Sequence, residues 1–229
     1  MSMKKCWPIL CSAIVAASTW WHADAAGEAA KENPVLTFYC RQAGQTFRRE
    51  GLAEQARRYS FTATSYRKQL GQKGQVGHVD TLVAEYYFTG ATLDSQKVLR
   101  ATSRKSYPLD FSAPNVFESD YHFAFFPNDT GGPLAIGFET DSAGDPRPTG
   151  LAVIGRYDYR LQRLYLFYAA RPGYNRFSKA IYLSDHHGYT FPDSMIEVTA
   201  KAGIFDTDFY RTESAVSEVK VSGEHSGRR

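Results

Sequence analysis

Cysteine is scarce in this chain, with three residues among 229. Cys6 and Cys11 lie in an apolar N-terminal segment, so Cys40 is the one thiol in the rest of the sequence. One thiol cannot form an intramolecular disulfide, and the fold must therefore depend on its apolar core. About 200 residues are enough for such a core in a single domain. Cys40 has apolar neighbours, which predicts a buried and unreactive side chain.

The chain also lacks a strong excess of charge of either sign, and it lacks catalytic signatures. The 27 basic and 24 acidic residues give a net charge of +3. Because no long basic block is present, a nucleic-acid partner is not expected. No Gly-x-Ser-x-Gly motif occurs, and we predict no catalytic residues and no cofactor. A small hydrolase stays open as an alternative, since four aspartates at expected turns could pair as acid and base: Asp141, Asp145, Asp206 and Asp208.

The segment Asp185-His186-His187 contains the residue types of a zinc site. His78 or His122 could add a ligand from another strand. Consecutive residues of a strand point to opposite faces, however, so the two neighbouring histidines would not easily share one ion. Their place at an expected turn explains their polarity equally well. We predict no metal site and keep a metal-binding enzyme as an alternative.

The first 25 residues have the pattern of an export signal. Lys4 and Lys5 precede an apolar run from Cys6 to Trp21. The small residues of Ala23-Asp24-Ala25 then match the pattern that a signal peptidase recognises. The sequence therefore predicts a signal peptide over residues 1–25, cleaved near Ala25, and a protein that works outside the cytoplasm.

Residues 33–58 are predicted to form helix in two pieces. Asn33 is a favourable N-cap, and Pro34 is tolerated in the first turn. Gly51 is expected to break the helix before a second piece at 52–56. Apolar residues recur at steps of three and four and form one stripe on the first piece: Leu36, Tyr39, Cys40, Ala43 and Phe47.

From Tyr59 onward the hydrophobic period changes to two, which is typical of strands. Alternating segments on either side of a Gly71–Gly74 turn predict a long hairpin. Tyr107–Val116, with two prolines, is predicted to be a loop, and His186-His187-Gly188 a turn. Further strands are expected at 96–101, 121–126, 134–140, 151–157, 161–169, 179–183, 194–200 and 205–221.

These elements predict one mainly β domain (α+β) over residues 26–221, followed by a frayed tail at 222–229. Thirty residues are Tyr or Phe. Leu164 and Leu166 oppose Tyr165 and Phe167 on one strand, so both of its faces are apolar. A flat sheet with one wet face would not need this. We therefore expect a strongly curved antiparallel half-barrel sheet with an N-terminal helical lid.

An apolar interior beneath a lid is suited to an acyl chain. The alternative is that the same side chains fill a closed core, as they do in small barrels. The candidate lining residues lie on apolar faces of the expected strands: Phe61, Leu82, Tyr86, Phe88, Phe123, Phe125, Ile136, Phe138, Tyr165 and Phe167.

Three segments of the second half carry a family resemblance. Thr149-Gly150-Leu151 through Asp158 reads as a strand and an Asp-containing turn, with Leu164 on the return strand. His187–Pro192 reads as a glycine-and-aromatic strand start that ends in proline, and Thr212-Glu213-Ser214 reads as the segment that precedes the final strand. This layout resembles the periplasmic outer-membrane lipoprotein-carrier superfamily (LolA-like and LppX-like proteins).

The resemblance implies a half-open barrel and an exported, non-enzymatic binder of lipid or lipoprotein acyl chains in envelope trafficking. The implied partners are these acyl chains and an envelope or inner-membrane protein. A second hypothesis keeps the fold but fills the core. In it the chain is a periplasmic protein-binding or sensor module that contacts its partner through a basic helix and an unpaired edge strand.

Overall fold

The computed structural model describes residues 33–222 except 56, 72–73, 104–108, 119, 127–130, 141–144, 169–173 and 203–206. The signal peptide expected at 1–25 and nearly all of the expected tail lie outside these residues, and the single domain over 26–221 stays a prediction. By its internal contacts the chain divides into two units, Met1–Thr37 and Phe38–Arg229, which are described separately. No helix of the described residues has the length and apolar character needed to cross a membrane.

Helix α2 spans Pro34–Glu50. In the first unit, the side-chain Oδ1 of Asn33 accepts hydrogen bonds from the backbone N–H groups of Val35 (3.1 Å) and Leu36 (3.3 Å), which confirms the predicted N-cap. In the second unit, the predicted apolar stripe is buried at Cys40, Ala43 and Phe47.

Burial of Cys40 raises the pKa of its thiol to about 12, because the thiolate would lose its hydration. The thiol is therefore protonated at neutral pH. The prediction of a buried cysteine is confirmed, and the raised thiol pKa supports the prediction that it is unreactive.

The second helical piece expected after Gly51 is wrong for residues 52–55, which form turns. Gly51 instead makes an isolated bridge to Thr190. The N–H of Leu52 also donates to the Thr190 carbonyl at 3.3 Å. Through these contacts the chain turns from the helix axis toward the sheet. The backbone of residues 51 and 52 is then paired with Thr190 and does not continue the helix.

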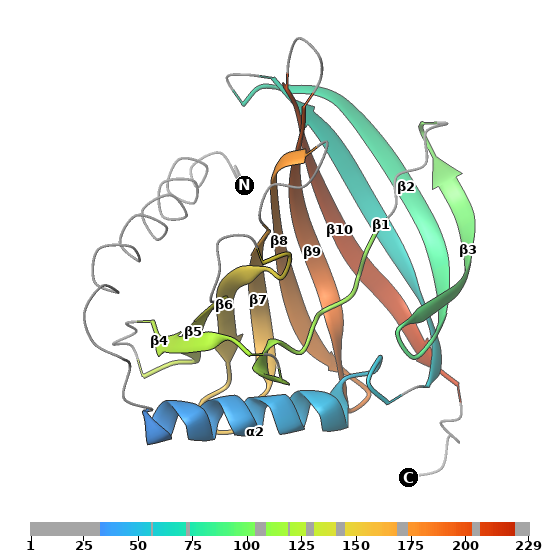
Figure 1. Ribbon diagram of the computed structural model, residues 1–229. Coiled ribbons are helices and arrows are strands. Elements are labelled where there is room, and N and C mark those ends of the chain that lie inside the picture. The colour runs from blue at the N-terminus through green and yellow to red at the C-terminus, as the bar shows by residue number, and fades with distance from the viewer. Residues whose placement is uncertain are drawn as a thin grey trace. The chain divides into compact units, whose positions relative to one another are not determined.

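The described residues form one open sheet of ten antiparallel strands in the order β3-β2-β1-β10-β9-β8-β7-β6-β5-β4. The last strand therefore lies between the first strand and β9, and every other neighbouring pair is consecutive in sequence. The mainly β half-barrel with a helical lid is confirmed (Figure 1). The strands are β1 (Arg58–Leu70), β2 (Val76–Thr89), β3 (Thr92–Ala101), β4 (His122–Phe125), β5 (Leu134–Glu139), β6 (Thr149–Ile154), β7 (Leu161–Tyr168), β8 (Tyr174–His186), β9 (Tyr189–Ala202) and β10 (Thr207–Val221).

The β8–β9 hairpin turns at His187 and Gly188, as the sequence predicts. Both residues have positive φ, 55° and 86°, which is the combination that a two-residue type I′ turn requires. This turn brings Asp185, at the end of β8, close to the loop that follows helix α2.

One face of the sheet carries the apolar core of the second unit. We call this the inner face, and five consecutively paired residues on it form a central row across β5 to β9. Each member of this row is at most 1% exposed: Ile136, Ala152, Leu164, Ile181 and Met195. The row continues to Ser214 and Ser65, whose buried hydroxyls hydrogen-bond to each other at 2.8 Å. Seven neighbouring strands thus share one buried face.

Gly150 of β6 lies where the inner face is closely packed. A Cβ atom there would fall inside contact distance of the Tyr165 carbonyl oxygen and 2.8 Å from the ring of Phe138. Gly77 of β2 is a strand glycine with room, because the nearest atom to its Cβ position is the Gln69 carbonyl oxygen at 3.7 Å.

We therefore expect Gly150→Ala to lower the free energy of unfolding by about 1–3 kcal/mol, the usual cost of overpacking. Gly77→Ala, the matched control, should be nearly neutral. Urea unfolding of the mature protein measures both. Equal losses in the two variants would contradict the close packing at Gly150.

Candidate functional site

A strap of chain, Leu109–Glu118, covers part of the inner face. Its first seven residues have no regular structure, as predicted for this region, and η1 (Val116–Glu118) ends it. The Phe111 ring lies 5.1 Å from that of Phe61 and 5.4 Å from that of Tyr86. Val116 is 1% exposed. The strap therefore supplies apolar cover that the open sheet does not provide for itself.

The strap is also fastened to helix α2. The guanidinium of Arg48 forms an ion pair with the Glu118 carboxylate, and its Nε donates to Oε1 at 2.8 Å. The side-chain amide of Asn115 donates to the Gly44 carbonyl at 3.4 Å. A Cβ atom at Gly44 would lie 3.2 Å from Cβ of Phe117, so glycine allows the helix and the strap to approach closely.

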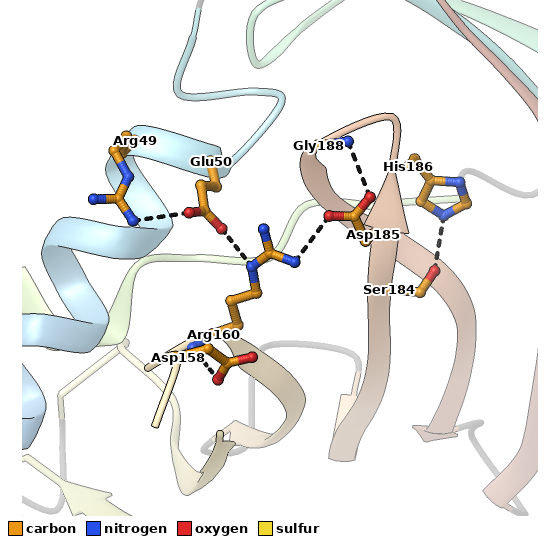
Figure 2. Close-up of polar contacts among 8 residues, drawn as sticks. All are labelled: Arg49, Glu50, Asp158, Arg160, Ser184, Asp185, His186 and Gly188. Carbon is orange, nitrogen blue, oxygen red and sulfur yellow. Dashed lines mark hydrogen bonds and ion pairs between the residues drawn. The ribbon is translucent and has the colours of Figure 1, made fainter. Parts of the chain in front are cut away.

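Three residues join the end of helix α2 to two hairpins of the sheet, and we call Glu50, Arg160 and Asp185 the latch (Figure 2). Arg160 lies in the turn between β6 and β7. Its Nε donates to Glu50 Oε2 at 2.7 Å, and its Nη1 donates to Asp185 Oδ2 at 2.9 Å. The other Asp185 oxygen accepts from the Gly188 N–H at 2.9 Å. The latch thus connects α2 to the β6–β7 and β8–β9 turns at once.

Glu50 needs this partner because it is the last residue of α2. A carboxylate at a helix C-terminus is disfavoured by the helix dipole, and the Glu50 side chain is only 15% exposed. For Arg160, partial burial alone would lower the pKa, but the hydrogen bond to Glu50 and the charges of Glu50 and Asp185 raise it. Arg160 therefore remains a permanent cation between two carboxylates.

A charged cluster lies on the inner face beside the central row. The next row of paired residues contains Leu166, Lys179 and Glu197. The Lys179 side chain is 1% exposed, and its Nζ lies 3.0 Å from Asp110 Oδ2 of the strap. Desolvation raises the pKa of Glu197, while the ammonium of Lys179 opposes that effect. Partial desolvation against the inner face would raise the pKa of Asp110 as well, but Lys179 and hydrogen bonds from Ser112 lower it.

Aromatic side chains gather near the end of helix α2 that lies opposite the latch. The Tyr39 ring lies 6.3 Å from Phe125 of β4 and 5.8 Å from Tyr159 of the β6–β7 turn. Phe38 lies 5.9 Å from the same Tyr159 ring. Phe38 and Phe125 are 40% and 36% exposed. An apolar rim therefore borders the buried inner face where helix α2 meets the edge strand β4.

Eight of the ten predicted lining residues lie on the inner face, as the strand register places them. The Phe61 ring stacks on the rings of Tyr86 and Phe88, and Phe88 also stacks on Tyr59. Leu82 pairs with Ser65 and so extends the central row to β2. Ile136 belongs to the central row, and Phe138 is 1% exposed beside it on β5. Phe125 pairs with Ile136 and Phe123 with Phe138 on the same face.

Tyr165 and Phe167 are not brought together with the other eight. They alternate with Leu164 and Leu166 on β7, and these two leucines are fully buried on the inner face. Tyr165 and Phe167 consequently lie on the outer face, where Phe167 is 36% exposed. The sequence could not decide between the two sides because both are apolar.

The histidine and aspartate alternatives find no converging set in the part of the chain that the structure describes. No three His, Cys, Asp or Glu side chains there are placed to hold a metal ion. His186 hydrogen-bonds to Ser184 at 3.0 Å, and burial lowers its pKa (Figure 2). Asp145 is paired with Arg147, and Asp208 accepts from Gln69. Asp141 and Asp206 lie outside the described residues.

Sequence reasoning missed both Arg160 and Lys179. Arg160 contacts partners 110 and 25 residues away, and no local pattern marks such a contact. Lys179 did leave a signal, because it shares the apolar face of its strand with Ile181. A cation at such a position requires a buried anionic partner.

The comparisons with known proteins concern the fold. No family model and no curated protein matches this sequence. The chain is structurally similar to a domain described as an outer membrane lipoprotein-sorting protein from Vibrio parahaemolyticus, with 11% identity, a TM-score of 0.40 and coverage of 81% of this chain and 93% of that one. A LolA superfamily protein from Nitrosomonas europaea is 9% identical, with a TM-score of 0.39 and coverage of 83% of this chain and 94% of that one. A DUF1329 family protein from Desulfovibrio piger is 9% identical, with a TM-score of 0.39 and coverage of 83% of this chain and 95% of that one.

One of these structures is described as a LolA superfamily protein, the family whose layout this sequence resembles. At these identities and TM-scores nothing about function transfers to this chain.

The latch predicts a local effect of removing Arg160. Arg160→Met keeps an aliphatic stem but leaves Glu50 and Asp185 without their cation. We expect a loss of about 1 kcal/mol of local stability, and so about fivefold faster amide hydrogen exchange in the last turn of α2 and at the β8–β9 turn.

Arg49→Met is the matched control. Arg49 pairs with the same Glu50 carboxylate, but it is 72% exposed and lies on the helix itself, so it joins no second element. The amide hydrogen-exchange pattern of Arg49→Met should stay that of the wild type. Identical patterns in the two variants would show that the latch does not hold the helix end.

Proposed function

We propose that this protein is an exported, non-enzymatic binder of lipid or lipoprotein acyl chains, which it holds on the inner face of its half-barrel sheet. One observation carries the proposal. The cover of the inner face is a helix and an irregular strap that, besides their apolar contacts, are held by polar ones: Glu50–Arg160–Asp185 and Asp110–Lys179 join the cover to the sheet, and Arg48–Glu118 joins the helix to the strap.

Such contacts suit a cover that opens. The ion pairs of Arg48 with Glu118 and of Arg160 with Asp185 lie near the surface, where such pairs contribute little net free energy because water replaces them readily. Water offers no comparable favourable contacts to the apolar inner face once the cover is removed. An acyl chain of about 14 methylenes that replaced the cover would gain about 11 kcal/mol at ~0.8 kcal/mol per methylene, before the cost of ordering the chain and displacing the cover.

The aromatic rim supplies an entry point in this account. Phe38 and Phe125 expose apolar surface beside the lid, and Phe126 follows β4 at 38% exposure. An acyl chain would contact this rim first and then pass under α2. Export to the periplasm, predicted from residues 1–25, would place the protein where envelope lipids and lipoproteins are handed on.

A second candidate function has its own observation. All ten residues of β3 are exposed, and β3 ends the sheet. Its inner-face residues Leu93 and Val98 are 47% and 54% exposed. A free edge of this kind favours strand addition by a protein partner, so a protein-binding or sensor module is the alternative.

Mass spectrometry of an organic extract tests the first proposal. The mature protein is purified from periplasm without detergent, and we expect an acyl-containing lipid at near-stoichiometric amount. An empty extract, together with failure to take up a fluorescent long-chain acyl probe, would favour the protein-binding alternative.

A reversible covalent latch tests the opening. In Glu50→Cys/Arg160→Cys, a bis-maleimide with a disulfide in its spacer replaces the ionic contact, and buried Cys40 stays unmodified because its thiol pKa is about 12. We expect the cross-linked protein to lose probe uptake and to regain it when the spacer is reduced. Unchanged uptake in the cross-linked form would show that α2 does not gate the inner face at this end.

A further inference from the structure

Lys179 is the one lysine among the described residues whose side chain is buried. It lies on the inner face of β8, between Leu166 of β7 and Glu197 of β9 in the same paired row, and two positions from Ile181 of the central row. Placing an ammonium group against apolar surface is costly unless anions and hydrogen-bond acceptors surround it. The position therefore defines an anion site inside the half-barrel.

The strap provides the ligands of this site. Lys179 Nζ donates to Asp110 Oδ2 and to the Ser112 carbonyl, both at 3.0 Å. Asp110 also accepts from the Ser112 N–H at 2.9 Å, which fixes its carboxylate in an Asx turn. Glu197 is the other carboxylate beside Lys179, and Arg67 follows in the same row beyond Thr212.

The two carboxylates differ in how they are held. Glu197 belongs to a strand in the middle of the sheet and cannot leave without unfolding it. Asp110 belongs to a segment without regular structure, and its side chain is 65% exposed although its partner Lys179 is 1% exposed. The carboxylate of Asp110 is therefore the exchangeable ligand of a fixed, buried cation.

Asp110 is followed by Phe111, whose ring contacts Phe61 and Tyr86 on the inner face. The strap thus places a carboxylate on the buried ammonium and an adjacent apolar group on the apolar face. A long-chain fatty acid has the same order of groups: a carboxylate head and an apolar chain. The strap occupies the inner face as such a molecule would.

We infer that Lys179 is the head-group site for the carboxylate of a long-chain fatty acid, which replaces Asp110 when the strap is displaced. The inference rests on the proposed acyl-binding function and names its ligand class. The exchange conserves charge, because one carboxylate replaces another while Glu197 stays in place. Phe111 leaves the aromatic cluster together with Asp110, and the chain of the ligand takes its contacts.

Competition binding on the mature protein tests the inference. An uncharged apolar fluorophore, N-phenyl-1-naphthylamine, is displaced by hexadecanoate or by its methyl ester, which have the same chain and differ in charge. For the wild type we expect hexadecanoate to bind about tenfold more tightly, the effect of a hydrogen bond to a charged group. Lys179→Met should lose this preference and keep its affinity for the ester.

Asp110→Asn gives an independent reading from an exposed strap residue. Removing the competing carboxylate should strengthen hexadecanoate binding more than ester binding, so the preference grows. This variant changes no residue of the sheet, and circular dichroism establishes that each variant is folded before titration. If Lys179→Met does not fold, the Asp110→Asn preference decides the inference alone.

The outcomes separate the inference from the proposed function. Equal affinity of the wild type for the two ligands, or a preference that persists in folded Lys179→Met or fails to grow in Asp110→Asn, would overturn the head-group site and leave acyl binding in place. Displacement by neither ligand in the wild type would overturn the proposed function itself.

Discussion

An apolar sheet face that does not close into a barrel has to be covered by another part of the chain, and the rest of this structure follows from that constraint. The ten strands leave the sheet open between β3 and β4. The central row from Ile136 to Met195 is nevertheless fully buried. Helix α2 and the strap supply the missing layer, which is why a segment with little regular structure carries the buried residues Phe111 and Val116.

The cover is fastened in a way that differs from the core beneath it. Within the sheet, adhesion comes from apolar contact and from backbone hydrogen bonds, which are costly to break. The cover adds polar contacts to its apolar ones: Arg160 and Lys179, each paired with a carboxylate, join it to the sheet, and the Arg48–Glu118 pair joins its two parts. A rigid sheet under a cover held partly by polar contacts can release the cover without losing its own fold, and that property connects the architecture to the proposed acyl binding.

Local patterns predicted most of the fold because each depends on near neighbours in sequence. Asn33 as an N-cap and the His187–Gly188 turn are examples, since capping and turn geometry involve only a few residues. The candidate site was predicted in part. Both sides of β7 are apolar, so alternation alone could not place Tyr165 on the outer face. The partners of Arg160 and Lys179 come from distant segments, and only the folded chain brings them together.

Photoaffinity labelling tests the central claim most directly. A fatty acid with a diazirine near its methyl end is bound to the mature protein, activated by light and located by fragmentation mass spectrometry. The account predicts labels on the buried part of the inner face and away from Lys179, at residues such as Phe61, Tyr86 or Ile136. Labels confined to Leu93 and Val98 of the β3 edge would contradict it, because they would place the apolar ligand on the exposed surface and leave the inner face as a filled core.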